Sequence, residues 1–167
     1  MNSPSTPSRR CLVVSPVKDE ERYVEATLLS VTRQTVLPTR WVIVDDGSSD
    51  GTSAILHRYA QEHAWIQVVT REQTGPRQPG SAVMDALCHG LAQAHGVSHD
   101  YLVKLDCDID LPPDYFEALL MRFERDPRLG IASGVYLEEG PSGWTPIGMP
   151  DYHAAGASKF MRAQCFD

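Results

Sequence analysis

Long apolar runs are missing from this sequence of 167 residues, and none approaches the roughly 18 residues that cross a bilayer. The first ten residues, MNSPSTPSRR, are rich in serine and proline and lack the apolar core of a signal peptide. We therefore expect residues 1–10 to form a disordered tail and residues 11–167 to form a single domain. The protein is expected to be cytoplasmic, and at most peripheral at the inner face of the membrane.

Basic residues are scarce, since 15 lysines and arginines face 22 acidic residues and the formal net charge is −7. No basic stripe is present, so a nucleic-acid partner is not expected. Cysteine pairs are missing as well, because the four cysteines are widely spaced and form no C-x-x-C motif. This spacing argues against a zinc site or a disulfide framework and indicates reduced thiols.

The loops that mark several enzyme classes are also absent. The first predicted strand does not lead into G-x-G-x-x-G, no G-x-x-x-x-G-K-[ST] occurs, and there is no G-x-S-x-G elbow. Dinucleotide binding, a P-loop and an α/β-hydrolase nucleophile therefore lack support. An anionic ligand would have to be attracted in another way, through a cation held by acidic side chains.

Strands and helices alternate along the chain. Strands are predicted at 11–17, 40–46, 65–71, 100–106 and 129–139, and helices at 20–35, 48–64 and 112–127. A further helix follows the loop 72–80, with Val83, Leu87, Leu91 and Ala94 on its buried side. Alternation with short, apolar strands predicts an α/β protein with a Rossmann-like, doubly wound, mainly parallel sheet. Ligands of such sheets bind beyond the carboxyl ends of the strands.

Three aspartates stand at every second position in VKLDCDIDLPPDYF: Asp106, Asp108 and Asp110. On an extended chain such neighbours lie about 7 Å apart and repel by about 2–3 kcal/mol at an effective dielectric near 20. This repulsion raises a carboxyl pKa or recruits a cation, unless the segment is simply a hydrated turn. The segments SPVKDEE and VDDGSSD also follow strands, so their acids are expected at the same edge of the sheet. A Mg²⁺ or Mn²⁺ ion that holds a diphosphate fits this edge.

The segments VVSPVKDEERYVEATLLSVTRQT, WVIVDDGSSDGT and YLVKLDCDIDLPPDYF, in this order, resemble the nucleotide-sugar half of family-2 glycosyltransferases. The later AAGASKFMRAQCFD is similar to their acceptor-side segment, so the resemblance covers about residues 11–167. It implies the A-type glycosyltransferase fold and inverting transfer from a nucleotide-diphospho-sugar, a UDP-sugar above all. It also implies Mn²⁺ or Mg²⁺ as cofactor and an acceptor that is a glycan, a lipid or a small molecule.

The resemblance implies eight ligand contacts. The nucleotide contacts would come from Pro16, Lys18, Glu20, Asp45, Asp46, Arg77 and Asp106. Asp46 would take the base edge, Asp106 the ribose or a metal-bound water, and Asp108 the cation that bridges both phosphates. Simpler roles stay open at this point: turn geometry for Asp45 and Asp46, and a favourable helix dipole for Glu20. Lys18 and Arg77 could equally be solvated loop residues.

The family's general base is an acidic residue that would follow Asp167, so the resemblance implies an incomplete acceptor site and exposed apolar faces that favour self-association. Asp151 and His153 are the substitutes that the sequence offers, and no motif supports them. Two other classes remain open: a donor-binding domain without transferase activity, and a Mg²⁺-dependent nucleotidyltransferase or phosphatase. A nucleotidyltransferase requires a Gly-rich basic loop after the first strand, and a phosphatase requires D-x-D-G-T there. The first strand instead ends in SPVKDEE, which disfavours both.

Overall fold

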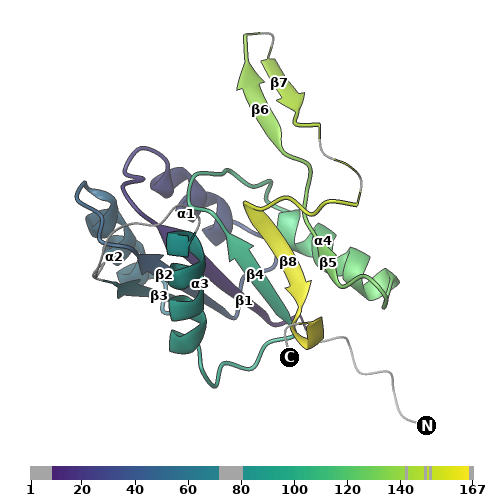
Figure 1. Ribbon diagram of the computed structural model, residues 1–167, viewed down its shortest axis with the longest axis horizontal. Coiled ribbons are helices and arrows are strands. Elements are labelled where there is room, and N and C mark those ends of the chain that lie inside the picture. The colour runs from purple at the N-terminus through teal and green to yellow at the C-terminus, as the bar shows by residue number, and fades with distance from the viewer. Residues whose placement is uncertain (1–8, 72–80, 142, 149, 151, 166–167) are drawn as a thin grey trace.

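The computed structural model describes residues 9–71, 81–141, 143–148, 150 and 152–165. Its centre is a six-stranded sheet with the order β3-β2-β1-β4-β8-β5 (Figure 1). The strands of this sheet are β1 (Cys11–Val17), β2 (Arg40–Asp45), β3 (Ile66–Thr70), β4 (Tyr101–Leu105), β5 (Ile131–Ala132) and β8 (Ser158–Arg162). The helices are α1 (Val24–Thr32), α2 (Thr52–Glu62), α3 (Ser81–Gln93), α4 (Tyr115–Arg125) and the short 3-10 helix η1 (Ala163–Cys165).

The sheet is mainly parallel, as the sequence predicts. Strand β1 pairs in parallel with β2 and β4, and β2 pairs in parallel with β3. Strand β8 runs antiparallel between β4 and β5. A separate hairpin of β6 (Leu137–Gly140) and β7 (Gly143–Pro146) projects from the body of the molecule (Figure 1). The predicted α/β class with a Rossmann-like sheet is therefore confirmed.

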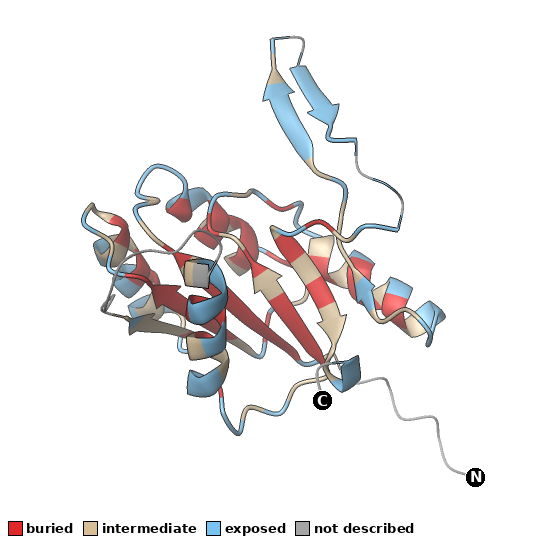
Figure 2. Ribbon diagram, in the orientation of Figure 1, coloured by how far each residue is buried: buried red, intermediate tan, exposed pale blue. Residues whose placement is uncertain are grey.

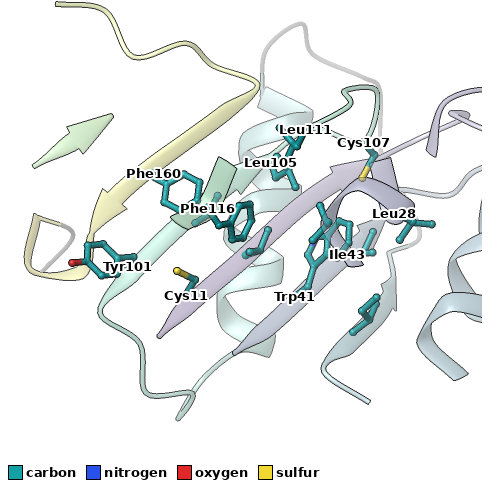
Figure 3. Close-up of a cluster of buried hydrophobic side chains, with 14 of the residues drawn as sticks. Cys11, Leu28, Trp41, Ile43, Tyr101, Leu105, Cys107, Leu111, Phe116 and Phe160 are labelled. Carbon is teal, nitrogen blue, oxygen red and sulfur yellow. The ribbon is translucent and has the colours of Figure 1, made fainter. Parts of the chain in front are cut away.

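Helices cover both faces of the sheet because the central strands are apolar on both sides. Cys11 and Val13 of β1 face the core under α1, α2 and α4, whereas Leu12 and Val14 face α3. The larger core contains Trp41, Phe116 and other fully buried aromatic side chains (Figure 3). Burying each such side chain stabilises the fold by about 1.5–3 kcal/mol. Figure 2 shows the central strands largely buried and the hairpin exposed.

Helix α3 lies unusually close to the sheet at Gly90. A Cβ atom placed there would meet Cγ1 of Val14 at 2.6 Å and Cγ2 of Val44 at 2.8 Å. Both atoms belong to β-branched side chains of central strands, which cannot turn away easily. Because glycine has no side chain, Gly90 allows α3 to lie this close to the sheet.

The helix predicted at 20–35 is shorter than expected and begins at Val24. The chain just before it turns instead, and its N–H groups bind the loop after β2. Asp19 N–H donates to Ser48 Oγ at 3.1 Å, and Glu20 N–H donates to Thr52 Oγ1 at 2.8 Å. The carbonyl of Glu20 accepts the N–H groups of Tyr23 and Val24, each at 2.9 Å, so the chain enters α1 through a turn.

The strand predicted at 129–139 is wrong. Only Ile131–Ala132 joins the main sheet, and Leu137–Gly140 pairs within the hairpin. Between them Gly134 N–H donates to Tyr115 Oη at 2.7 Å, so side chains replace the ladder bonds there. The place beside β4 is taken by β8, for which no strand was predicted and which lies in the segment that resembles the acceptor side of the family.

Residues 1–8 of the predicted tail lie outside the described residues, but Arg9 and Arg10 are anchored. Arg9 Nε lies 2.7 Å from Glu124 Oε1, and Arg10 Nη2 lies 2.9 Å from Asp100 Oδ1. Arg9 and Arg10 are thus held by side chains of α4 and of the segment before β4. Within the described segments, no helix combines the length and apolar character that a membrane crossing requires.

Candidate functional site

A cleft of about 280 Å³ opens at the carboxyl ends of β1 and β4, against the first turns of α3. We call it the strand-end cleft. Six of the eight residues predicted to contact ligand line it: Pro16, Lys18, Glu20, Asp46, Asp106 and Asp108. The other lining residues are Val17, Ala82, Val83, Ala86, Lys104 and Cys107. Segments that are far apart in sequence therefore meet at one edge of the sheet, as expected for ligand binding in such folds.

Helix α3 contributes an apolar wall to this cleft. Val83, which was predicted to be buried, is 47% exposed and lines the cleft, so that prediction is wrong. The burial that periodicity predicts is found further along the helix, at Leu87 and Ala94. The wall is apolar and could pack against a flat ring.

The loops after β1 and β2 hold each other through reciprocal hydrogen bonds. Asp19, whose φ is 55°, accepts the Ser49 N–H at 2.6 Å on Oδ1. Glu21 Oε2 accepts the Gly51 N–H at 3.1 Å, and Glu21 N–H donates to Asp50 Oδ2 at 3.1 Å. The N–H groups of Asp19 and Glu20 add two further hydrogen bonds, to Ser48 and Thr52. The cleft residues Lys18, Glu20 and Asp46 therefore belong to a pair of loops that hydrogen bonds join.

Asp46 is only 5% exposed and forms an ion pair with Arg71. Both Nε and Nη2 of Arg71 lie 2.7 Å from Oδ1 of Asp46. The parallel register pairs Asp45 with Thr70, which brings the next residues of the two strands together. Arg71 Nη2 also lies 3.4 Å from the carbonyl oxygen of Ala82, at the start of α3. Arg71 carries no sequence motif and was not predicted as a site residue, yet it joins the β2 end of the cleft to its α3 wall.

One of the predicted contacts, Asp45, serves the fold instead of the cleft. Asp45 is buried, and its Oδ1 accepts the Ser48 N–H at 2.9 Å, so this carboxylate stabilises the turn after β2. It does not line the strand-end cleft. Arg77 lies outside the described residues, as does Asp151, one of the two substitute bases that the sequence offers. The other, His153, lies elsewhere and lines a second cavity.

Asp106 forms an ion pair with Lys104 inside the cleft. Burial raises the pKa of Asp106, the Lys104 ammonium lowers it, and the charge of Asp108 raises it again, with a net increase. The Asp106 N–H donates to the carbonyl of Ala157 at 2.7 Å, which ties this end of β4 to the segment before β8. Asp106 is thus held in a fixed place with its charge partly compensated.

Glu20 and Asp108 face the same cleft, and their negative charges are less compensated than the charge of Asp106. Burial raises the pKa of Glu20, and the carboxylates of Asp108, Asp50 and Asp106 raise it further. Asp108 is exposed and has no hydrogen bond or ion pair with any described residue. Two carboxylates that repel each other across an open cleft favour the binding of a cation between them.

The donor set in the cleft fits Mg²⁺ or Mn²⁺ only as a shared site. Carboxylate oxygens are the ligands that these hard cations prefer. No group of three or more His, Cys, Asp or Glu in the described part of the chain could hold a metal ion by itself. A cation there would take one or two ligands from the protein and the rest from phosphate oxygens and water, which is usual for Mg²⁺ at phosphate sites.

The loop that carries Asp108 is supported by α1. Thr27 Oγ1 donates to the carbonyl of Ile109 at 2.7 Å and accepts the Ile109 N–H at 3.1 Å. Gln34 is buried and bridges the same region, because it donates to the carbonyl of Pro112 at 2.6 Å and accepts the Phe116 N–H at 3.0 Å. Side chains far away in sequence thereby fix the position from which Asp108 enters the cleft.

Cys107 lies in the cleft lining but is nearly buried. Burial raises the pKa of its thiol to about 12, so it is neutral near pH 7 and a poor nucleophile. All four cysteines are free thiols, as predicted. The chemistry of the cleft therefore rests on its carboxylates and on Lys18 and Lys104.

A cleft at the carboxyl edge of a mainly parallel sheet is the usual ligand site of open α/β proteins. The model of the family described as "Glycosyl transferase family 2" matches residues 12–160, which is most of the chain. The chain therefore belongs to glycosyl transferase family 2.

Curated relatives include two bacterial proteins of polysaccharide synthesis. Poly-beta-1,6-N-acetyl-D-glucosamine synthase of Staphylococcus aureus (strain COL) is 29% identical over 116 residues, which are 70% of this chain and 26% of that protein. Succinoglycan biosynthesis protein ExoA of Rhizobium meliloti (strain 1021) is 32% identical over 122 residues, which are 72% of this chain and 34% of that protein. The chain thus spans about a quarter to a third of the length of these relatives.

Solved structures of glycosyltransferases share the fold. Staphylococcus aureus TarS 1-349 in complex with UDP superposes with a TM-score of 0.65 at 19% identity, over 92% of this chain and 46% of that chain. The mannosyltransferase PcManGT from Pyrobaculum calidifontis, in complex with GDP-Man and Mn²⁺, gives a TM-score of 0.62 at 22% identity, over 93% and 45%. The A-type glycosyltransferase fold implied by the sequence is thereby confirmed.

Proposed function

We propose that the strand-end cleft binds a nucleotide-diphospho-sugar together with Mn²⁺ or Mg²⁺, and that the whole enzyme transfers the sugar to an acceptor with inversion. The observation that carries the proposal is the convergence of Glu20, Asp46, Asp106 and Asp108 from three strand ends on one cleft. The TarS structure with UDP and the PcManGT structure with GDP-Man and Mn²⁺ support a nucleotide ligand and a divalent cation.

The nucleoside is proposed to occupy the part of the cleft between Asp46 and α3. Asp46, held by Arg71, accepts a hydrogen bond from the base, and the N3–H of uracil suits this acceptor. Pro16 and the apolar wall at Val83 contact the faces of the ring and ribose. We propose uridine as this nucleoside, in keeping with the UDP bound by TarS 1-349.

The diphosphate is proposed to lie toward the end of β4. Lys18 and Lys104 bring positive charge to this part of the cleft, and Asp106 contacts the ribose or a water. Asp108 holds the divalent cation. When bound, the cation stabilises the negative charge that develops on the diphosphate as the glycosidic bond breaks.

Replacing Asp108 tests this assignment. Asp108→Ala is expected to abolish the Mn²⁺-dependent part of UDP binding while the fold stays intact, because Asp108 is exposed and bonded to no described neighbour. The matched control is Asp110→Ala, an exposed acid two residues away that does not line the cleft. Calorimetric titration with UDP, with and without Mn²⁺, measures the effect.

The control should bind UDP with Mn²⁺ as the unchanged chain does. Equal loss in both variants would mean that Asp108 acts only through the general charge of the loop. Unchanged metal-dependent affinity in Asp108→Ala would remove Asp108 from the cation site.

Nucleotide-sugar binding without transfer is a second candidate for this chain. It is favoured because the described carboxylates that line the cleft are all proposed to serve the nucleotide or the cation, so none of these four is assigned to take the acceptor's proton. General-base catalysis accelerates such steps by about 10²–10⁴-fold. A radiolabelled UDP-sugar assay decides: binding with only slow hydrolysis supports this candidate, and acceptor-dependent turnover contradicts it.

A further inference from the structure

Lysine is rare in this chain, and its lysines gather at one edge of the sheet. Only three of the 15 basic residues are lysines: Lys18, Lys104 and Lys159. Lys18 and Lys104 line the strand-end cleft. Lys159 is the second residue of β8, and no role is assigned to it in the nucleotide site or the cation site. Its position relative to the cleft follows from the pairing of β8.

Lys159 lies directly opposite Lys104. Strand β8 runs antiparallel to β4, so its first residues lie beside the carboxyl end of β4, where the cleft opens (Figure 1). The register pairs Lys159 with Lys104, and side chains paired in this way share a face of the sheet with their Cβ atoms about 4.5–5.5 Å apart. The N–H of Asp106 donates to the carbonyl of Ala157 at 2.7 Å, so the chain that enters β8 is in direct contact with a residue of the cleft.

The side chain of Lys159 lies on the α3 side of the sheet, as the cleft does. Met161, two residues later on the same face of β8, packs against the apolar cluster that contains Ala86 and Leu87 of α3. Ala86 also lines the strand-end cleft. Lys159 therefore shares a face with Lys104, and the positive charge of the cleft continues beyond β4.

The opposite face of β8 holds the strand in place. Ser158 Oγ lies 2.5 Å from Tyr115 Oη and accepts a hydrogen bond from Tyr136 Oη at 2.8 Å. Phe160 is fully buried in the larger core. These two residues flank Lys159 in the sequence and fix its backbone, so only its own flexible side chain is left to adjust to a ligand.

The charge of Lys159 has no acidic partner among the described residues. Lys159 is half-buried, and within the part of the chain that the structure describes it forms no ion pair and no side-chain hydrogen bond. The ammonium group of Lys104, on the opposite strand, is already paired with Asp106. Like charges directly across two strands destabilise a sheet. An anion bound between the two ammonium groups would offset this repulsion.

The order of the strands indicates which phosphate Lys159 can reach. Asp46, which is proposed to bind the base, follows β2, and strands β1 and β4 lie between β2 and β8. At a spacing of about 4.8 Å per strand, β2 and β8 are about 14 Å apart. A nucleoside ends short of this distance, whereas an extended nucleoside diphosphate brings its terminal phosphate toward β8.

We propose that Lys159 binds the terminal phosphate of the nucleotide, and that Lys104 and Lys159 together recognise the diphosphate without the divalent cation. Each ammonium group donates hydrogen bonds to phosphate oxygens. The inference rests on the proposed function, because it presupposes a nucleotide in the strand-end cleft. It adds a residue of β8 to that site and a metal-independent part to the affinity for the diphosphate.

The test is a ¹H–¹⁵N NMR titration of the chain with UDP, UMP and uridine in the presence of EDTA. UDP is expected to bind at least about tenfold more tightly than UMP, because only UDP carries the phosphate that reaches Lys159. Lys159→Gln is expected to weaken UDP binding by about tenfold and to leave the affinities for UMP and uridine unchanged. Lys159→Arg keeps the charge and is expected to keep most of the UDP affinity. The control is Arg125→Gln, which removes an exposed positive charge of α4 outside the cleft.

Three results would overturn the inference: metal-free UDP that binds no more tightly than UMP, equal UDP affinity of Lys159→Gln and Arg125→Gln, or an equal loss of UMP affinity in Lys159→Gln. Thermal unfolding shows whether the variants fold. Lys159→Gln is expected to be no less stable than the unchanged chain, because the repulsion between β4 and β8 is gone.

The titrations are repeated with Mn²⁺ to separate this inference from the proposed function. If UDP binds with Mn²⁺ and Lys159→Gln has no effect in either condition, the lysine assignment is wrong and the proposed function stands. If UDP binds in neither condition, the proposed function is wrong and the lysine assignment falls with it. Asp108→Ala should keep the metal-free UDP affinity that Lys159→Gln loses, which supports both.

Discussion

The carboxylate of Asp46 is almost fully buried, and the guanidinium of Arg71 compensates its charge at 2.7 Å. A buried charge is costly unless it is paired, so the orientation of Asp46 depends on Arg71. The Arg71 side chain is itself 21% exposed and also reaches the backbone at Ala82. A nucleotide base that donates a hydrogen bond to Asp46 therefore depends on both residues of this ion pair.

Removing Arg71 should impair nucleotide binding through Asp46. We expect Arg71→Gln to weaken UDP binding by about tenfold or more, because a hydrogen bond to a charged group is worth about 1.5–3 kcal/mol. The double variant Asp46→Ala/Arg71→Gln should bind no more weakly than Asp46→Ala alone, since the two side chains act as a unit. Calorimetry without metal measures both. The control is Arg58→Gln, whose partner Glu25 is half exposed, and additive losses would argue against coupling.

Glu20 makes the stability of the fold depend on pH. Its pKa is raised in the folded protein, so it stabilises the fold below its ordinary value of 4.5, and this contribution is lost as the pH rises through the raised pKa. Glu20→Gln should therefore be more stable than the unchanged chain at pH 7, and the difference should shrink below pH 4.5. Thermal unfolding across this range measures it. The exposed Glu138 provides the control as Glu138→Gln, and the same profile there would contradict a local origin.

Residue patterns predicted the acids of the cleft but not their partners. Asp106 and Asp108 were found because like charges at every second position after a strand need an explanation. Arg71 carries no motif, and only the register of β2 against β3 brings it to Asp46. Asp45 was placed with the ligand because it adjoins Asp46, although alternation along a strand sends neighbours to opposite sides.

Helix α3 positions one wall of the cleft, and Gly90 positions the helix. Alanine in place of a helical glycine normally stabilises by about 0.5–1 kcal/mol. At residue 90 the new methyl would lie 2.6 Å from Val14 Cγ1, and such overpacking costs about 1–3 kcal/mol. We expect Gly90→Ala to lower the free energy of unfolding by about 1 kcal/mol or more, as measured by urea denaturation. Gly156→Ala is the control, because nothing lies within 4 Å of its Cβ position; a more stable Gly90→Ala would refute the argument.

Whole elements were predictable where burial dominates. The strands at 11–17, 40–45 and 101–105 are apolar runs buried on both faces, and the prediction found each within a residue or two. The segment 129–139 has an equally suitable composition, but hydroxyl groups of Tyr115 and Ser133 bind the chain around Gly134 and Ala155 instead. Strand β8 was missed because five residues with modest alternation resemble many loops. Tertiary partners decide such cases, and they are invisible along the sequence.

For the molecule as a whole, we expect ligand binding to raise the stability of the native state. A ligand at 100 times its Kd stabilises the native state by about 2.7 kcal/mol, which corresponds to a rise in Tm of about 5–10 °C for a chain of this size. We expect this rise with UDP and Mn²⁺ together. Mn²⁺ alone should have little effect, because no group of three or more potential ligands in the described chain could hold it. Differential scanning fluorimetry measures both, and a large shift with Mn²⁺ alone would point to a metal site made by the protein itself.

The sheet order places β8 between β4 and β5, although β8 comes after both in the chain. During synthesis β4 therefore leaves the ribosome with one edge unpaired, and β5 has no neighbour until residues 158–162 follow. The nascent chain can form the β3-β2-β1-β4 half of the sheet first, but the half with β8 and β5 must wait. For that interval an unpaired β4 edge is open to other nascent chains, a recognised route to aggregation. Slow translation between α4 and β8 should thus lower the yield of native protein.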